Sequence, residues 1–413
     1  MSKQKKTLLI FSQCFVYGGS ERLMQSIYKS KYLNENYNVI FSYSYFKDYK
    51  KGIERDCAEQ EIVAKIQPLY LLTNGDVFNK IDLQFKSKSM RYFLKSPLFF
   101  IEFFKIYALW NYIYLFVYMF KIKPEVLHIN NGGYPAAISC NQLAKVSLFF
   151  NKTRVIYQSN GKAIFNKNRY NRFFDYLINK SVDIFLTHSK QNRESLIERG
   201  FNPSKIVSVP SYFNETVLNS TTNIVKKNEF TLCMVGFLTY RKGQLFLLKA
   251  LLCIKNKNPS LYSKIHLNII GNGSEFHTLK TFIEENDMTQ IVTLWGERAD
   301  YINFIINCDI FLIPSVAGED LPLVLLSAMQ YKKCIIASEF SGIGEQLSNG
   351  FNGLLVQPNI NTISDELCDA IIKLCLDNEL RKKLSINVFE SFNQNLGENR
   401  YVDNLNRIYN NLS

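Results

Sequence analysis

Residues 308–338 read CDIFLIPSVAGEDLPLVLLSAMQYKKCIIAS, and this stretch decides the fold that the sequence predicts. The apolar runs CDIFLIP and KKCIIAS are typical of buried strands, and the segment LVLLSAM between them, apolar all round, predicts a buried helix. Pro322 suits the first turn of that helix, where a missing N–H group costs nothing. A strand, a helix and a second strand within a stretch of this length predict that the two strands are parallel neighbours in one sheet.

The loop before this helix predicts a ligand site. Free N–H groups at a helix N-terminus bind phosphate, and the loop follows the carboxyl end of a strand, where open α/β sheets bind ligands. Glu319 and Asp320 lie beside it, and a carboxylate accepts hydrogen bonds from sugar hydroxyls. The stretch alone is equally compatible with Glu319 as a cap of the helix. A helix end beside a carboxylate favours a ligand that is part phosphate and part sugar.

The stretch also resembles a known signature. The segment EDLP (319–322), a buried helix, a strand and the segment SGIGE (341–345) are similar to the pattern E-G-F-P-x-x-x-x-E, strand, G-G-x-x-E of the GT-B glycosyltransferases of family 4 (glycosyl transferases group 1). The resemblance implies that Glu319 holds sugar hydroxyls and that Leu321 and Glu345 belong to a nucleotide-sugar site. The second Glu of the pattern, which usually holds the ribose, is Ser327 here, and a hydroxyl offers one donor and no charge.

A second motif lies at 230–251, FTLCMVGFLTYRKGQLFLLKAL, which predicts a strand, a loop and a helix. The basic pair Arg241 and Lys242 on the loop is suited to neutralising a diphosphate, although two surface charges are the simpler alternative. The family shows G-R-L-x-x-x-K-G here, with the Arg and the Lys on the diphosphate. Lys242 and Gly243 match this pattern, and Gly236, after the strand, is assigned to the nucleotide site. Phe237 replaces the Arg, so Arg241 is expected to supply the second charge.

Further glycines match the family's nucleotide-binding turns. The segment NIIGNGSE (268–275) resembles its strand and G-x-G-x-E turn, which assigns Gly271 and Gly273 to the nucleotide site. The strand TLLIF (7–11) is followed by Gly18 and Gly19, which let the backbone approach a ligand closely. This loop resembles the family's acceptor-side loop, which faces the donor across the interdomain cleft, so both glycines are expected to contact the nucleotide sugar.

Four polar residues of the first half are assigned to the acceptor side. The strand VLHIN (126–130) places His128 and Asn130 where several family members line the cleft, although a lone His is also compatible with a buried structural role. Many members carry a His near the reacting sugar carbon where this chain has Ser159 or, in the alternative alignment, Gln158. Lys162 follows, and it is suited equally to an anionic acceptor and to a solvated surface.

Length and order predict two domains. A chain of 413 residues exceeds one ordinary core. The expected fold is α/β, with two Rossmann-like doubly wound domains facing across a cleft, as the GT-B resemblance implies. We expect an acceptor-binding domain at 1–213, a linker at 214–229 and a nucleotide-sugar-binding domain at 230–385. Residues 386–413 are expected to form a C-terminal helix that crosses back to the first domain.

Charge and composition indicate the partners and the compartment. Residues 1–213 hold 31 Lys and Arg against 15 Asp and Glu, whereas 214–413 hold 18 against 21. The basic half predicts an anionic partner, and no nucleic-acid-binding signature is present. Residues 85–123 mix aromatic and basic residues, which favours contact with an anionic membrane surface; two ordinary helices packed on the sheet are the alternative. Nine scattered Cys without a C-x-x-C pair are typical of reduced thiols in the cytoplasm.

The resemblance to the GT-B family implies a retaining glycosyltransferase of the hexosyltransferase type, and the fixed cations are expected to replace a metal or a resident cofactor. It would move a sugar from a nucleotide-diphosphate sugar to a glycan acceptor, lipid-linked, at the inner face of the cytoplasmic membrane, in the synthesis of a bacterial surface polysaccharide (lipopolysaccharide, O-antigen or capsule). Lys242, Arg241 and Glu319 are the expected catalytic residues. The alternatives are a GT-B sugar epimerase and, because of Ser327, Phe237 and Ser159, a non-catalytic scaffold of an assembly complex.

Overall fold

The computed structural model describes residues 5–14, 17–58, 64–72, 81, 84, 87–103, 106–165, 169–210, 229–396 and 398–411. The chain forms two compact units. The first comprises Met1–Thr187, Arg193–Ser208 and Val402–Ser413, and the second comprises His188–Asn192 and Val209–Tyr401. Residues 211–228, which include almost all of the predicted linker, lie outside the described residues.

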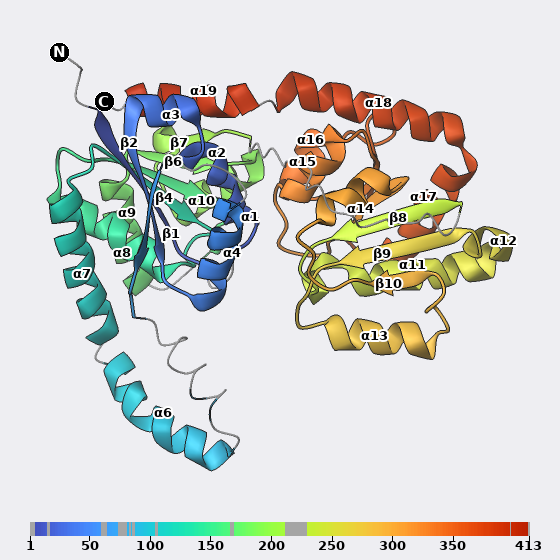
Figure 1. The fold of residues 1–413 in the computed structure, drawn as a ribbon, viewed down its shortest axis with the longest axis horizontal. Coiled ribbons are helices and arrows are strands. Elements are labelled where there is room, and N and C mark those ends of the chain that lie inside the picture. Colours follow the sequence, from blue (N-terminus) through green and yellow to red (C-terminus); the bar gives the residue numbers. More distant parts are fainter. Residues whose placement is uncertain are drawn as a thin grey trace. The chain divides into compact units, whose positions relative to one another are not determined.

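The first unit is built on a seven-stranded parallel sheet in the order β3-β2-β1-β4-β5-β6-β7 (Figure 1). The strands are β1 (Lys6–Ser12), β2 (Tyr37–Ser44), β3 (Lys65–Leu69), β4 (Val126–Asn131), β5 (Arg154–Ser159), β6 (Ile184–Thr187) and β7 (Ile206–Ser208). The direction in which strands are added reverses between β1 and β4. Doubly wound sheets bind ligands outside the carboxyl ends of the strands at this switch point.

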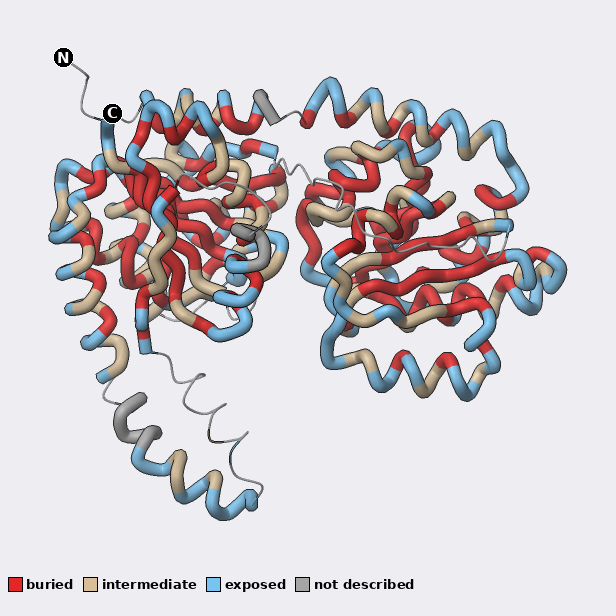
Figure 2. Tube along the Cα trace, in the orientation of Figure 1, coloured by how far each residue is buried: buried red, intermediate tan, exposed pale blue. Residues whose placement is uncertain are grey.

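Helices cover both faces of this sheet. They are α1 (Gly19–Leu23), α2 (Gln25–Tyr28), α3 (Lys31–Asn36), α4 (Lys47–Ala58), α6 (Lys88–Phe103), α7 (Ile106–Ile122), α8 (Ile138–Val146), η1 (Ser147–Phe149), α9 (Arg169–Ser181), α10 (Lys190–Arg199), η2 (Pro203–Lys205) and α19 (Glu398–Asn411). Side chains of a strand alternate between the two faces. Leu9 and Phe11 of β1 therefore share one core with Leu115 and Met119 of α7, and the strands are the most deeply buried part of the unit (Figure 2).

The segment 44–84 has no clear hydrophobic period in its sequence, yet it contains α4 and β3. The sequence of α4, KDYKKGIERDCA, is mostly polar and carries few apolar residues. Tyr49 and Ile53 are one helical turn apart, and both are buried. Two side chains on one face suffice to hold a short helix on the sheet, but they are too few to give a clear periodic signal.

The last helix belongs to the first unit. Tyr409 of α19 is fully buried, and its hydroxyl forms a hydrogen bond of 2.7 Å with Nδ1 of His128, which lies 281 positions earlier. The hydroxyl of Tyr37 also binds Oδ1 of Asn410, at 3.1 Å. The first unit is thus assembled from segments that lie before and after the second unit in the sequence.

The second unit has a six-stranded parallel sheet in the order β10-β9-β8-β11-β12-β13 (Figure 1). The strands are β8 (Phe230–Val235), β9 (Ile265–Ile270), β10 (Val292–Leu294), β11 (Ile310–Ile313), β12 (Cys334–Ser338) and β13 (Leu354–Val356). The helices are η3 (Tyr240–Lys242), α11 (Gln244–Lys257), α12 (Pro259–Tyr262), α13 (Phe276–Glu285), α14 (Tyr301–Asn307), α15 (Leu323–Gln330), α16 (Ser341–Gln346), α17 (Ile363–Leu376) and α18 (Asn378–Asn395).

The strand, helix and strand predicted at 308–338 are β11, α15 and β12, and the two strands pair in parallel. Pro322 is the N-cap of α15, one position before the first turn where we expected it. The prediction of two doubly wound α/β domains is confirmed. Among the helices in the described residues, none combines the length and the apolar character needed to cross a membrane.

Candidate active site

The second sheet reverses its direction of strand addition between β8 and β11, and the two predicted motifs lie there. The loop after β8 carries Arg241 and Lys242, and the loop after β11 carries Glu319. The carbonyl oxygen of Arg241 accepts a hydrogen bond of 2.8 Å from the N–H group of Val316, which ties the loops together. The fold thus brings both motifs to the place where a doubly wound sheet binds its ligand.

Glu319 is the centre of a small charged cluster. Its Oε2 forms an ion pair with Nζ of Lys242, lies 3.6 Å from an Nη atom of Arg241, and accepts a hydrogen bond of 3.0 Å from the hydroxyl of Ser315. Arg241 also donates to the carbonyl oxygen of Gly318, at 3.1 Å. Two cations against one carboxylate leave an excess of positive charge, which suits a phosphate ligand.

The N-terminus of α15 adds to this positive field. No side chain caps it at Pro322, so Glu319 does not act as the helix cap that the sequence left open. Uncapped N–H groups at a helix N-terminus favour anions. Asp320, next to Glu319, has a partner outside the cluster: its Oδ1 accepts a hydrogen bond of 3.3 Å from the N–H group of Gly342 in α16. Burial raises the pKa of Asp320.

Glycines allow the loops at this edge to pack closely. A Cβ atom on Gly243 would lie 1.8 Å from the carbonyl oxygen of Pro314, and one on Gly271 would lie 1.9 Å from that of Gly236. A Cβ atom on Gly273 would lie 2.3 Å from the carbonyl oxygen of Leu238. Gly243, Gly271 and Gly236 also have positive φ angles. Glycine is required here for the packing of one loop on another, a reason the motif alone did not reveal.

The other residues assigned to the nucleotide lie close to the same edge. Leu321 is buried just before α15. Ser327 is buried within α15, and its hydroxyl donates to the carbonyl oxygen of Leu323 at 3.3 Å. Glu345, in α16, accepts a hydrogen bond of 2.7 Å from the N–H group of Lys190. Their roles in nucleotide binding stay predictions.

The glycine loop of the first unit lies at its own switch point, after β1. The N–H group of Gly18 donates to Oε2 of Glu21 at 3.1 Å, and Glu21 also accepts from the hydroxyls of Ser12 and Ser20. Asn130, at the end of β4, donates to the hydroxyl of Ser12 at 3.0 Å and to the carbonyl oxygen of Ser20 at 3.2 Å. Glu21 is buried, and burial raises its pKa. It holds the turn at Gly18 and the start of α1 at Gly19 in place.

Among the acceptor-side residues, His128, Asn130 and Ser159 are buried, whereas Lys162 is exposed. The second ring nitrogen of His128, Nε2, contacts Oε1 of Gln158 at 3.0 Å, so both nitrogens are engaged. This is the structural role that the sequence left open for a lone His. The hydroxyl of Ser159 donates to the carbonyl oxygen of Gly161 at 3.0 Å, which shapes the loop that carries Lys162.

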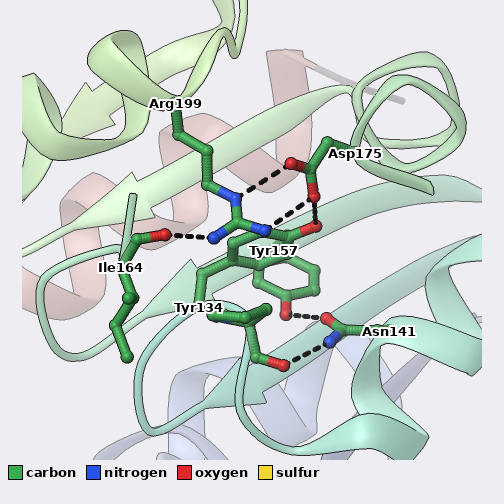
Figure 3. Close-up of polar contacts among 7 residues, drawn as sticks. Tyr134, Asn141, Tyr157, Ile164, Asp175 and Arg199 are labelled. Atoms are coloured by element: carbon green, nitrogen blue, oxygen red, sulfur yellow. Dashed lines mark hydrogen bonds and ion pairs between the residues drawn. The ribbon is translucent and has the colours of Figure 1, made fainter. Parts of the chain in front are cut away.

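A buried network that the sequence did not predict fixes the far end of this loop (Figure 3). Arg199 of α10 binds Asp175 of α9 through two hydrogen bonds, of 3.0 and 3.1 Å, and donates to the carbonyl oxygen of Ile164. The hydroxyl of Tyr134 donates to the same carboxylate, and the guanidinium lies over its ring at 4.5 Å. Burial and the Asp175 carboxylate raise the pKa of Tyr134. The contributing residues are scattered in sequence, so no spacing pattern marks them.

Within the described part of the chain, no three His, Cys, Asp or Glu side chains are grouped so as to hold a metal ion. The charged cluster instead offers fixed cations, which can bind a phosphate directly and neutralise charge that develops on it.

Comparison with known proteins finds similarity to glycosyltransferases. Residues 219–390 match the family model described as "Glycosyl transferases group 1". The chain is 28% identical over 297 residues to an uncharacterized glycosyltransferase of Methanocaldococcus jannaschii, a match that spans 70% of this chain and 69% of that protein. It is 26% identical over 203 residues to an Escherichia coli protein named UDP-Gal:alpha-D-GlcNAc-diphosphoundecaprenol alpha-1,3-galactosyltransferase, over 47% of this chain and 51% of that protein.

The fold has close counterparts among solved structures. The crystal structure of Anabaena Alr3699/HepE in complex with UDP and glucose superimposes with a TM-score of 0.71, at 14% identity, over 98% of this chain and 99% of that chain. At a sequence identity this low, the comparison shows only that the two folds are alike.

Proposed function

We propose that the chain, whose residues 219–390 match the group 1 glycosyltransferases and whose fold is that of GT-B structures, transfers a hexosyl group from a nucleotide-diphosphate sugar to a lipid-linked glycan in the assembly of a bacterial surface polysaccharide. The donor would bind to the second unit, at the switch point between β8 and β11. The acceptor would bind to the basic first unit.

The cluster of Lys242, Arg241 and Glu319 carries this proposal. When the sugar leaves the donor, negative charge develops on the departing diphosphate. Lys242, Arg241 and the uncapped N-terminus of α15 would stabilise that charge, since preorganised groups of this kind lower the barrier without reorganising. Glu319 holds the two cations in position and would accept hydrogen bonds from the sugar hydroxyls.

The fixed cations also support the proposal that transfer needs no metal ion and no resident cofactor. We expect the product to keep the anomeric configuration of the donor, as the family signature implies. Activity that persists in excess EDTA, together with an NMR spectrum of the product, tests both statements. Loss of activity in EDTA that Mg²⁺ or Mn²⁺ restores contradicts the first, and an inverted anomeric coupling constant contradicts the second.

Two observations support a lipid-diphosphate acceptor. The name of the E. coli relative specifies such an acceptor for that protein, and residues 1–213 of this chain carry a large excess of positive charge. A diphosphate linked to a lipid is confined to the membrane surface. We therefore place the protein in the cytoplasm, bound peripherally to the inner face of the cytoplasmic membrane.

A thermal-shift screen of UDP, GDP, ADP, dTDP and CMP tests the donor site directly, since a ligand that binds the native state raises its apparent stability. We expect one nucleoside diphosphate to raise the melting temperature of the wild type, and to raise that of Lys242→Ala much less. If no nucleotide changes the melting temperature, the enzymatic proposal fails and the scaffold alternative gains support. If Lys242→Ala responds as the wild type does, the position of the site is wrong.

A further inference from the structure

Helix α7 is apolar on two opposite faces, and its inner face is fixed to the first unit. Leu115 and Met119 are fully buried in the core. Asn111 holds the backbone of Leu72 by two hydrogen bonds, because its Oδ1 accepts from the N–H group at 2.9 Å and its Nδ2 donates to the carbonyl oxygen at 2.8 Å. The hydroxyl of Tyr118 lies 2.6 Å from that of Ser42 in β2. These contacts hold the helix against the unit along its length.

The opposite side of the helix carries large apolar side chains that stay about half exposed. Their exposed fractions run from 41% to 62%, and their spacing of three or four positions puts them on one stripe. We call this stripe the outer face of α7; it consists of Ile106, Leu109, Trp110, Ile113, Phe116, Val117 and Phe120. The trace of α7 alternates between buried and exposed positions in Figure 2. A continuous apolar surface of this kind marks an interaction site.

The surroundings of the outer face are aromatic and basic. Phe149 of η1 is 75% exposed, and its ring lies 5.9 Å from that of Phe116, which extends the apolar surface beyond the helix. The helix contains no Asp or Glu, and the exposed residues Lys121 and Lys123 follow at its C-terminal end. Lys152, also exposed, comes three positions after Phe149. Cations at the border of an apolar surface match the phosphate groups of anionic lipids.

From this combination we infer that the outer face of α7 is the surface by which the protein binds an anionic phospholipid bilayer. The helix lies parallel to the membrane plane, with its apolar side chains between the acyl chains and the three lysines on the lipid phosphates. Its 17 residues are fewer than the roughly 20 that a spanning helix needs, and the contacts of Asn111 keep its other face on the protein. The inference rests on the proposed function in one respect, namely which face of the membrane the protein binds. Beyond that function, it assigns the membrane contact to named residues.

The charge favours a bilayer over a protein partner. A protein interface surrounds its apolar centre with a mixed polar rim, whereas three exposed lysines, Lys121, Lys123 and Lys152, lie at the border of the outer face. The excess of positive charge over residues 1–213 acts in the same direction, because it attracts the protein to an anionic surface before the apolar side chains enter it.

Trp110 reports directly on this contact, because the chain has only two tryptophans, Trp110 and Trp295. In full-length Trp295→Phe protein, we expect the emission of Trp110 to shift to shorter wavelength with vesicles of phosphatidylcholine and phosphatidylglycerol, and to be quenched when the acyl chains carry bromine. Vesicles of phosphatidylcholine alone should have a much smaller effect. Protein that sediments with anionic vesicles while the Trp110 emission is unchanged overturns the assignment of the surface.

A matched pair of triple variants tests the apolar side chains. Leu109→Gln/Ile113→Gln/Phe120→Gln removes three residues of the outer face, and Ile360→Gln/Leu376→Gln/Ile386→Gln removes three equally exposed apolar residues of the second unit. We expect the first variant to lose at least tenfold in vesicle affinity and the second to bind as the wild type does. Circular dichroism and melting temperature establish that both fold. Equal binding by the two variants overturns the inference.

A second pair tests the charge. Lys121→Gln/Lys123→Gln should weaken binding to anionic vesicles severalfold, and high salt should abolish the difference from the wild type. Lys382→Gln/Lys383→Gln in α18 changes the net charge equally and should have no effect. Sedimentation velocity tests whether the outer face of α7 binds a second copy of the chain instead. A dimer that the triple variant of α7 abolishes, without vesicle binding by the wild type, overturns the inference and assigns the face to a second copy.

Vesicle binding is measured without donor or acceptor, so it stands apart from the proposed chemistry. The α7 variant should keep the nucleotide-induced thermal shift of the wild type, whereas Lys242→Ala should lose the shift and keep vesicle binding.

Discussion

Nζ of Lys242 and Oε2 of Glu319 form an ion pair although the residues lie 77 positions apart in the sequence. The side chains are only 13% and 9% exposed, respectively. A charge in such a place is poorly solvated and is stable only when it is paired. The carboxylate of Glu319 therefore holds the ammonium group of Lys242 at the edge of the sheet before any ligand binds.

Replacing Lys242 by Ala should lower kcat by about 100-fold or more, the usual cost of removing one preorganised group that stabilises transition-state charge. The measurement is the initial rate of sugar transfer with the donor that the thermal-shift screen identifies. Lys264→Ala is the matched control, because Lys264 forms an exposed ion pair with Glu229 at 2.9 Å, away from the cluster. Equal rates for the wild type and Lys242→Ala would remove this residue from the mechanism.

Gly271→Ala should destabilise the second unit more than Gly350→Ala does. Both glycines have positive φ, 142° at Gly271 and 75° at Gly350, and the left-handed conformation of Gly350 costs an alanine about 1–2 kcal/mol. A Cβ atom on Gly350 meets nothing within 4 Å, whereas one on Gly271 would lie 1.9 Å from the carbonyl oxygen of Gly236. The clash should add about 1–3 kcal/mol to the loss. Urea unfolding of the two variants measures the difference, and equal midpoints would contradict the close packing of these loops.

Arg199→Ala should cost about 3–5 kcal/mol of unfolding free energy, because it leaves the buried carboxylate of Asp175 without its cation. Arg154→Ala removes an exposed partner of Asp183, at 3.6 Å, and should cost no more than about 1 kcal/mol. Arg199→Lys should not restore full stability, since an ammonium group does not reproduce the paired contacts of the guanidinium. A loss for Arg199→Ala no larger than that for Arg154→Ala would show that the network contributes little.

His188 should make stability sensitive to acid. Burial lowers the pKa of His188 from 6.5 to about 4, and one ring nitrogen contacts the carbonyl oxygen of Val209 at 3.0 Å. Between these two pKa values the unfolded chain binds the proton and the folded protein does not, so stability falls as the pH falls. Relative to His188→Gln, the wild type should lose about 2 kcal/mol between pH 7 and pH 5. Urea titrations at both pH values measure this, and a constant difference would contradict the shifted pKa.

The regular elements of the second unit were predictable because their strands are short apolar runs that the motifs delimit. The strand before Glu319 and the strand at 334–338 agree with β11 and β12 to within a few residues. The sequence also placed Lys242 and Glu319 in one site, through a resemblance, and the fold brings them into contact.

Other features depend on tertiary contacts that no local pattern encodes. The Arg199 network joins residues that are 24 and 35 positions apart, without a recurring spacing. The apolar pattern of α7 was equally compatible with a helix buried on both sides, and only the packing shows that the face of Ile113 is exposed whereas that of Leu115 is not. The role of Ser315 was missed as well, because a single serine after a strand carries no signal.

The hydrogen bond between His128 and Tyr409 has a consequence for synthesis on the ribosome. The first unit begins to emerge early, yet the residue that completes its core is translated only after the whole second unit. Until Tyr409 is synthesised, the buried imidazole of His128 lacks the hydroxyl that contacts its Nδ1, and the first unit is incomplete. Because translation runs from the N-terminus, the first unit can reach its final structure only after the second unit has been synthesised.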